Sequence, residues 1–383
     1  MAQNRRGCGC LLVVLALAAA VAVGVYLKFY RPKGPQLPPA SGGELQVHVL
    51  DVGQGDAILI RAPGGKTALV DAGDEAHAKS VLEALGRYQV QQLDYFIATH
   101  PHPDHIGGAP AVLKAVKVLN VLDNGVPPAD AEQSAAAPAQ AAKGKGKPAA
   151  KKPPARPRAA AQLPTTKTYR DFQDAAKQSG AQLAPATPGQ RYDLGGGVLL
   201  TALAPVPPPF TEEQMRGGGN VPNANSVVLR LDYGDFSMLL AGDAEAQTEQ
   251  RLISNNVNLA ATLLKVAHHG SKYATTDEFV RRVKPAAALI SLGEFNRYGH
   301  PAQAVLERLR SAGARVYRTD LQGELTIISK GEGYEIKPSK ETAGDQLYAG
   351  RTGQKDDSER SGFIAYGDFG PPPKQPKKPA NGK

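Results

Sequence analysis

Six of the eight histidines of this 383-residue chain fall within three short segments. The segments are THPHPDHIGG (99–108), VAHHGS (266–271) and RYGHP (297–301). The six residues are His100, His102, His105, His268, His269 and His300. Both cysteines, Cys8 and Cys10, lie far from these segments, so the remaining chain offers imidazole and carboxylate ligands without thiolates. Such ligands suit Zn²⁺, Mn²⁺ or iron, and we expect one or two divalent ions, Zn or Mn.

The spacing H-x-H-x-D-H at 100–105 gives a physical reason for this prediction. His100 and His102 are two residues apart, so an extended backbone aims both rings the same way. The prolines between them stiffen that extended path. Asp104 and His105 then fall at the start of a helix, from which they can face a second ion. The alternative, a set of ordinary surface or core histidines, is disfavoured by this clustering.

Further ligands are expected where apolar strands end. Asp243 ends the run MLLAGD and is predicted to be a bridging metal ligand. It can also serve as the N-cap of the segment that follows. Alternation along a strand through AHHGS would let either His268 or His269 face the metal, and the residues alone leave open which one does.

Other residues near these motifs are candidates for contact with the substrate. His300 is expected to donate a proton to a leaving group or to orient the substrate; the alternative is a histidine at a helix entry. Lys272 would meet a substrate phosphate, or it is a solvated surface lysine. Asn225 is a further candidate substrate-binding residue. GQGD at 53–56 favours turn geometry over a phosphate cradle.

These motifs follow apolar strands in a chain that alternates strands with amphipathic helices. Strands are expected near 45–51, 57–61, 93–100, 182–185 and 197–204. The second half repeats the theme, starting with a hairpin that turns at Tyr233 to Asp235. Such alternation is typical of sheets covered by helices. Two similar halves predict a four-layer α/β sandwich.

Composition divides the chain into three parts. Residues 1–42 contain a stretch without charge from Cys8 to Leu27, which as a helix would span about 30 Å. We interpret it as a signal anchor or signal peptide that places the protein outside the cytoplasm, anchored to the membrane or secreted. Residues 43–342 are the expected folded domain, which contains all three histidine-rich segments. The insert 128–162 and the tail 343–383 are expected to be disordered, because they contain too few residues able to form a core.

The net charge of +9 does not describe the folded part. The segments 1–42, 128–162 and 343–383 carry +5, +5 and +2, which leaves −3 for the rest. Composition therefore does not imply a basic nucleic-acid-binding face on the domain. The basic segments would attract nucleic acid or anionic lipid, or they act as solubilising linkers.

Seven pieces together resemble the metallo-β-lactamase superfamily, and within it the ComEC-type competence hydrolase domain. In order along the chain they are DVGQGDAILI (51–60), LVDAG (69–73), THPHPDHIGG (99–108), NANSVVLRL (223–231), LLAGD (239–243), KVAHHGS (265–271) and YGHP (298–301). The resemblance implies an αββα fold and a one- or two-metal site at the sheet edges. It implies metal ligands at His100, His102, Asp104, His105, Asp243 and either His268 or His269. It also makes Asp71 a structural aspartate beneath the metal loop.

Two departures from the family pattern matter. Many superfamily members carry one more histidine ligand before the strand that leads to Asp243, where this chain has Asn223 and Asn225. One of the two metal positions would then bind its ion weakly, or water or an amide oxygen would complete its coordination. ComEC-type channels also carry many membrane helices, whereas this sequence offers one candidate, so it resembles the hydrolase domain alone.

The resulting hypothesis is a metal-dependent hydrolase of phosphodiesters, with nucleic acid as the substrate that the resemblance implies. Asp104 would orient the attacking water, and His300 or Lys272 would steady the developing charge. One alternative is the same chemistry on another exported ester, a lactone or a β-lactam. Another is a non-catalytic binding module of the cell envelope, although the complete H-x-H-x-D-H motif argues against it.

Overall fold

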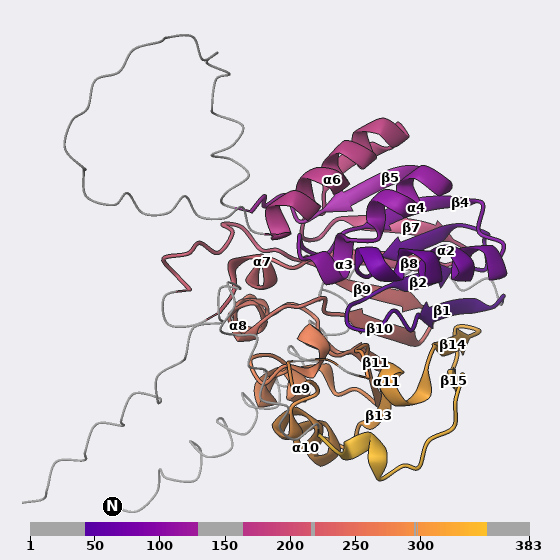
Figure 1. The fold of residues 1–383 in the computed structure, drawn as a ribbon. Helices are drawn as coiled ribbons and strands as arrows, with labels where there is room; N and C mark the ends of the chain where they lie inside the picture. Colours follow the sequence, from indigo (N-terminus) through magenta and orange to yellow (C-terminus); the bar gives the residue numbers. More distant parts are fainter. Residues whose placement is uncertain (1–42, 129–163, 216–218, 295, 297, 351–383) are drawn as a thin grey trace, which may run out of the picture. The chain divides into compact units, whose positions relative to one another are not determined.

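The computed structural model describes residues 43–128, 164–215, 219–294, 296 and 298–350, all within one compact unit. Two β-sheets pack face to face, and helices cover the outer face of each sheet (Figure 1). This arrangement confirms the predicted sandwich of helices and sheets.

The first sheet has eight strands in the order β15-β14-β1-β2-β3-β4-β5-β6. Strands β3 to β6 run parallel to one another, and the remaining pairs are antiparallel. The bounds are β1 Leu45–Val49, β2 Ile58–Arg61, β3 Thr67–Val70, β4 Gln92–Ile97, β5 Lys117–Asp123, β6 Gln182–Pro185, β14 Leu325–Ser329 and β15 Glu335–Pro338.

The second sheet has seven strands in the order β13-β12-β11-β10-β9-β8-β7. Strands β10 to β13 are parallel, whereas β7, β8, β9 and β10 pair antiparallel. The bounds are β7 Arg191–Gly195, β8 Val198–Ala204, β9 Val228–Tyr233, β10 Phe236–Leu240, β11 Leu263–Lys265, β12 Ala287–Ile290 and β13 Arg315–Arg318.

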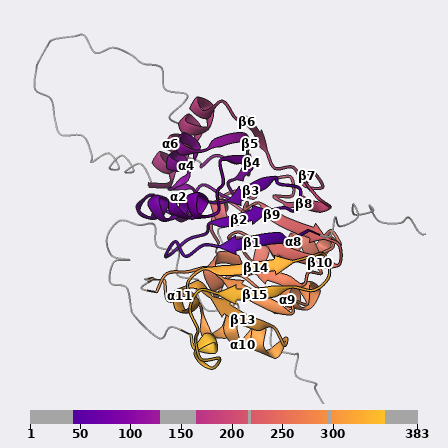
Figure 2. The same ribbon diagram turned by 90° about the vertical axis from the view of Figure 1, so that its right-hand side faces the viewer.

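Helices α2, α4 and α6 pack on the first sheet, and α8, α9 and α10 pack on the second (Figures 1 and 2). Their bounds are α2 Ala78–Arg87, α4 Ala109–Ala115, α6 Pro164–Ser179, α8 Ala246–Ser254, α9 Asp277–Val283 and α10 Gln303–Ser311. Shorter helical turns are α3 Pro103–Ile106, α7 Val221–Ala224, α11 Thr319–Gln322, η2 Glu75–His77, η3 Ala267–Gly270 and η4 Gln346–Tyr348.

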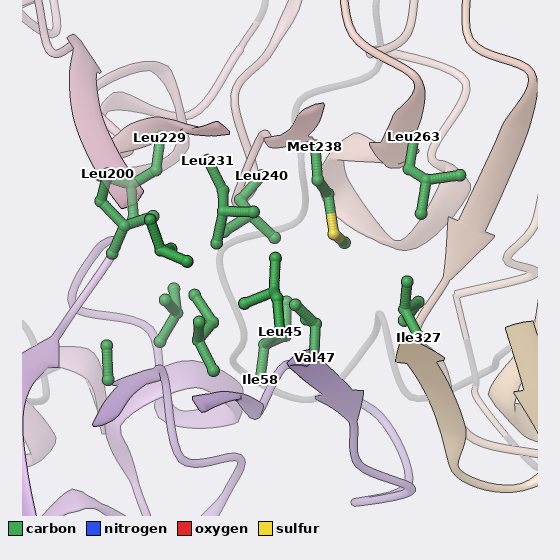
Figure 3. Close-up of a cluster of buried hydrophobic side chains, with 14 of the residues drawn as sticks. Leu45, Val47, Ile58, Leu200, Leu229, Leu231, Met238, Leu240, Leu263 and Ile327 are labelled. Atoms are coloured by element: carbon green, nitrogen blue, oxygen red, sulfur yellow. The ribbon is translucent and has the colours of Figure 1, made fainter. Parts of the chain in front are cut away.

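The core between the sheets is made of side chains from both inner faces (Figure 3). In β2, Ile58 and Ile60 enter this inner core, whereas Leu59 joins the layer beneath the helices. The strand is therefore buried on both faces. This explains why its sequence is continuously apolar and does not alternate with polar residues.

The structure corrects one predicted boundary, because the domain continues past residue 342. Residues 343–350 include η4, whose Leu347 is buried, and the neighbouring Tyr348 packs against the second-sheet core. The predicted leader, the insert apart from Pro128, and the tail beyond 350 lie outside the described residues. Within the part of the chain that the structure describes, no helix has the length and apolar character needed to cross a membrane.

Candidate metal centre

The predicted metal-binding residues follow the carboxyl ends of strands from both sheets. In the first sheet, Asp71 follows β3 and the H-x-H-x-D-H loop follows β4, which is parallel to β3. In the second sheet, Asp243 follows β10 and the His268-His269 pair follows the parallel strand β11. Carboxyl ends of parallel strands open on the same edge, where ligands bind in α/β sheets.

Three of these residues form a first ligand set, consisting of His100, His102 and Asp243. The Nε2 atom of His100 lies 3.0 Å from Nδ1 of His102 and 3.7 Å from Oδ2 of Asp243. One ligand atom from each residue lies within 4.8 Å of the other two. The three atoms are therefore close enough to share one ion.

A second ligand set consists of Asp104, His105 and His269. Nε2 of His269 lies 3.3 Å from Nε2 of His105 and 3.4 Å from Oδ2 of Asp104. The other oxygen of Asp243, Oδ1, lies 3.3 Å from Nε2 of His105 and 3.6 Å from Nε2 of His269. Asp243 thus faces the first set with one oxygen and the second set with the other, as a bridging carboxylate would.

The electrostatics of the site suit metal binding, which needs ionised carboxylates and neutral imidazoles. Burial lowers the pKa of His100 well below its usual value, so this ring is neutral near pH 7. Burial opposes ionisation of Asp243, but the nearby His105, His269 and His268 outweigh it and hold its pKa well below normal. Burial likewise lowers the pKa of His105, yet the surrounding carboxylates of Asp243, Asp71 and Asp104 raise it well above normal. In the protein without metal, protons on His105 therefore balance part of the negative charge.

An unpartnered polar atom provides a direct test of whether a cation fits here. Oδ1 of Asp243 is buried and has no hydrogen-bond partner among the described residues. Its nearest neighbours are the ring nitrogens of His105 and His269, at 3.3 Å and 3.6 Å, so in the protein without metal the proton on His105 compensates part of the cost of burying this oxygen. A divalent cation between Asp243, His105 and His269 would compensate this oxygen, so the residues present fit such an ion.

Asp71 supports the metal loop from below. Its backbone adopts a positive φ of 58°, and its side chain is fully buried. Its Oδ1 accepts a hydrogen bond from the backbone N–H of Thr99 at 2.8 Å, and its Oδ2 accepts one from the Thr99 hydroxyl at 2.7 Å. The same Oδ2 lies 2.7 Å from Nδ1 of His105. Asp71 thereby fixes the orientation of the His105 ring, which leaves Nε2 directed at the second set.

The histidine pair is not on a strand, which corrects the predicted strand through AHHGS. Strand β11 ends at Lys265, and His268 and His269 lie in the turn η3 with positive φ angles of 49° and 53°. This turn directs His269 into the second ligand set. His268 lies beside it, with Nε2 3.8 Å from Oδ2 of Asp243 and Nδ1 3.8 Å from Glu245.

The two asparagines before β9, Asn223 and Asn225, have different surroundings. Asn223 is buried, and its Nδ2 donates to Oε1 of Glu245 at 3.2 Å and lies 3.4 Å from His268. Its Oδ1 has no hydrogen-bond partner among the described residues. Asn225 instead binds backbone: its Nδ2 donates to the carbonyls of Phe210 and Val221, and its Oδ1 accepts from the Phe210 N–H. The structure therefore assigns Asn225 a role in holding this loop, and not the predicted contact with substrate.

The two remaining candidates differ in their distance from the ligand sets. The His300 ring lies 5.5 Å from the His268 ring and 6.4 Å from the His269 ring, between centroids. Its Nδ1 is buried and has no hydrogen-bond partner among the described residues. Lys272 is exposed, and its ammonium lies 4.9 Å from the centre of the Tyr273 ring. The structure thus brings His300 to the site, whereas Lys272 contacts Tyr273 at the surface.

A buried support behind the second ligand set was not predicted from the sequence. Lys265 is fully buried, and its Nζ lies 2.8 Å from Oδ2 of Asp56 in the GQGD loop. Oδ1 of Asp56 in turn lies 3.6 Å from Nδ1 of His269, which contacts the Ser291 carbonyl at 2.8 Å. A lysine inside the apolar run ATLLKVA was the available signal, because a buried lysine requires an acidic partner.

Comparison with known proteins identifies a family match and several related proteins. The family model described as the metallo-beta-lactamase superfamily matches residues 50–202. ComE operon protein 3 of Bacillus subtilis (strain 168) is 28% identical over 304 residues, which cover 75% of this chain and 33% of that protein. Competence protein ComA of Neisseria gonorrhoeae is 27% identical over 298 residues, covering 77% and 33%. Recombination protein 2 of Haemophilus influenzae (strain ATCC 51907 / DSM 11121 / KW20 / Rd) is 27% identical over 299 residues, covering 77% and 30%.

The chain thus spans about a third of the length of these curated relatives. The match to them includes both halves of the sandwich, since it extends over three quarters of this chain. Residues 50–202 of the chain, which contain the H-x-H-x-D-H loop, thus match the metallo-β-lactamase superfamily, and over three quarters of its length the chain is similar to ComEC-type competence proteins.

Proposed function

We propose that this protein is a metal-dependent phosphodiesterase that cleaves nucleic acid. The observation that carries the proposal is the pair of ligand sets that share Asp243. Two adjacent cations can neutralise both the attacking and the leaving oxygen of a phosphodiester. The names of the relatives, competence and recombination proteins, support nucleic acid as the substrate.

The residues around the two sets have separable roles in this proposal. Divalent ions, when bound, supply the Lewis acidity that activates water and polarises the phosphoryl group. The Asp104 side chain is 27% exposed, against 3% for Asp243, so Asp104 is the carboxylate that can accept a hydrogen bond from the attacking water. Burial lowers the pKa of His300 well below normal. Its neutral ring would therefore orient the substrate by hydrogen bonding and would not act as a standing cation.

We also propose that the protein works outside the cytoplasm, attached to the membrane or secreted. The support is the uncharged stretch from Cys8 to Leu27 behind Arg5 and Arg6. In that setting the basic segments 128–162 and 343–383 would hold polyanions near the domain. Cell fractionation with a protease-protection assay tests this part, because protection from protease added outside an intact cell membrane contradicts it.

The activity is tested with purified protein freed of metal by chelation and reloaded with Mn²⁺ or Zn²⁺. Its substrates are single-stranded DNA, bis(p-nitrophenyl) phosphate and nitrocefin, a β-lactam. We expect cleavage of the two phosphodiesters, abolished in His102→Ala and retained in the matched control His77→Ala. His77 is suitable because it pairs with Asp74 on η2, outside both ligand sets.

Cleavage of nitrocefin alone would assign the site to β-lactams and overturn the nuclease proposal. Metal binding without cleavage of any phosphodiester, DNA included, would also overturn it. Equal activity in His102→Ala would show that the first ligand set does not carry the reaction.

A further inference from the structure

An exposed aromatic ring, that of Tyr298, contacts a histidine that lies beside the metal centre. Among the described residues, four large hydrophobic side chains are exposed, namely Leu119, Leu183, Tyr298 and Tyr334. Tyr298 is the most exposed of them, at 47%. It is also the one that contacts a residue of the site, because its ring is stacked on His300 with centroids 5.7 Å apart and planes inclined by 25°.

This contact continues inward to a candidate metal ligand. The ring of His300 is stacked on that of His269, with centroids 6.4 Å apart and planes inclined by 29°. His269 belongs to the second ligand set. Three roughly parallel rings, His269, His300 and Tyr298, therefore lead from the metal centre to the surface. Such offset arrangements are those that aromatic rings prefer.

The segment that carries the outer two rings is braced by hydrogen bonds. Asn296 is 7% exposed, and its Oδ1 accepts from the backbone N–H of His300 at 2.9 Å. Its Nδ2 donates to the carbonyls of His300 and Gly293 at 2.8 Å and 3.0 Å. These bonds hold His300 in place before any substrate binds. The protein therefore loses little conformational entropy when a ligand stacks on this series of rings.

We infer that Tyr298 is a stacking platform for the nucleobase next to the scissile phosphodiester, and hence that the substrate is single-stranded nucleic acid. The inference rests on the proposed phosphodiesterase function and adds the substrate class. Every base has a face that can stack on an aromatic ring, so such a platform tolerates all sequences. A base inside a duplex already has its faces covered by neighbours, which excludes it from this platform unless it leaves the stack.

The steady-state test compares two strands that differ only in their bases. One is a short oligothymidylate, and the other is an abasic strand of the same length with the same phosphodiesters. We expect Tyr298→Ala to lower kcat/KM on oligothymidylate roughly ten-fold, the scale of losing one base–aromatic contact. The same variant should leave kcat/KM on the abasic strand unchanged. Tyr298→Phe should retain activity on both, and Tyr334→Ala, an exposed tyrosine on the β14–β15 turn, is the matched control.

A binding measurement gives a readout that does not depend on turnover. A phosphorothioate-linked strand with 2-aminopurine should lose fluorescence on binding to the wild type and to Tyr298→Phe, because stacking quenches this base. Tyr298→Ala should bind without that quenching.

The outcomes separate the two proposals. An equal fall on both strands, or no fall on either, overturns the platform while leaving the phosphodiesterase intact. Absence of quenching in the wild type also overturns the platform. A wild type that cleaves neither strand and no other phosphodiester overturns the proposed function, and the platform with it.

Discussion

One carboxylate, that of Asp243, determines how the two ligand sets are related. Its Oδ2 faces His100 and its Oδ1 faces His105 and His269. Because the side chain is almost fully buried, water cannot readily take its place. Any substitution that removes the negative charge shared by the two oxygens should therefore weaken metal binding in both sets and not only in one.

A glycine next to the site has no room for a side chain. A Cβ on Gly55 would lie 2.1 Å from the carbonyl oxygen of Asp104, at a φ of +130°. We expect Gly55→Ala to lower the free energy of unfolding by about 1–3 kcal/mol. It should also weaken metal binding, because Asp104 must move. Chemical denaturation and metal titration measure the two effects.

Gly65 provides the matched control for this prediction. It also has a positive φ, of +88°, but a Cβ there would meet no atom within 4 Å. Gly65→Ala should therefore cost only backbone strain and leave metal affinity unchanged. Equal metal affinity in the two variants would contradict the expectation that a side chain at position 55 displaces Asp104.

At the scale of elements, β11 is tied to the GQGD loop by a buried ion pair. Lys265→Met would leave the Asp56 carboxylate buried without its partner. Breaking a buried pair in this way costs about 3–5 kcal/mol, which we expect as the loss in free energy of unfolding. Adding Asp56→Asn removes the unpaired charge, so the double variant should recover part of the loss.

Lys337→Met on β15, where the side chain is 55% exposed, is the control and should change the free energy of unfolding by less than about 0.5 kcal/mol. A double variant as unstable as Lys265→Met would contradict the role of the pair.

A second set of polar contacts, made by Glu324, connects the end of α2 to the β13–β14 connection. Its carboxylate accepts hydrogen bonds from Arg87 and from the Tyr88 hydroxyl, and lies 3.5 Å from Nδ1 of His48. Burial would raise the pKa of Glu324, but the contacts with His48, Tyr88 and Arg87 outweigh burial and lower it below 4.5. A carboxyl group with a lowered pKa stabilises the fold above its unfolded pKa, and this contribution is lost as pH falls through the folded pKa.

We therefore expect Glu324→Gln to reduce the free energy of unfolding by about 1–2 kcal/mol at neutral pH. The difference from the wild type should shrink as pH falls below 4.5, the ordinary pKa of the group. Urea unfolding at a series of pH values measures it. Glu335→Gln on β15, whose side chain is 61% exposed, serves as the control. A difference that stays constant down to acid pH would contradict the assigned cause.

Most secondary-structure elements could be predicted from the sequence, whereas one turn and one long-range ion pair could not. Apolar runs and turn residues predicted most strands and helices, because both faces of a strand such as β2 are buried. The turn η3 was not predictable, since apolar alternation into AHHGS continues a strand pattern and no residue there marks the two positive φ angles. The pairing of Lys265 with Asp56 joins positions 209 residues apart. Such a contact follows only from the packing of the two sheets.

At the scale of the whole molecule, the sandwich brings together segments that lie far apart in the chain. His105 and His269 are 164 residues apart in sequence, yet their Nε2 atoms are 3.3 Å apart. Each sheet supplies part of the centre, so neither half of the domain could bind the ions alone. We therefore expect metal binding and the docking of the two sheets to stabilise each other.

The metal centre is tested most directly by the metal content of the purified protein after loading with Mn²⁺ or Zn²⁺ and removal of free ions. Elemental analysis compares the wild type with Asp243→Asn and with Asp235→Asn, an exposed aspartate at the turn of the same hairpin. We predict that the wild type and Asp235→Asn retain bound metal and that Asp243→Asn loses it. A wild type without metal, or an Asp243→Asn variant with as much metal as the wild type, would contradict the central claim.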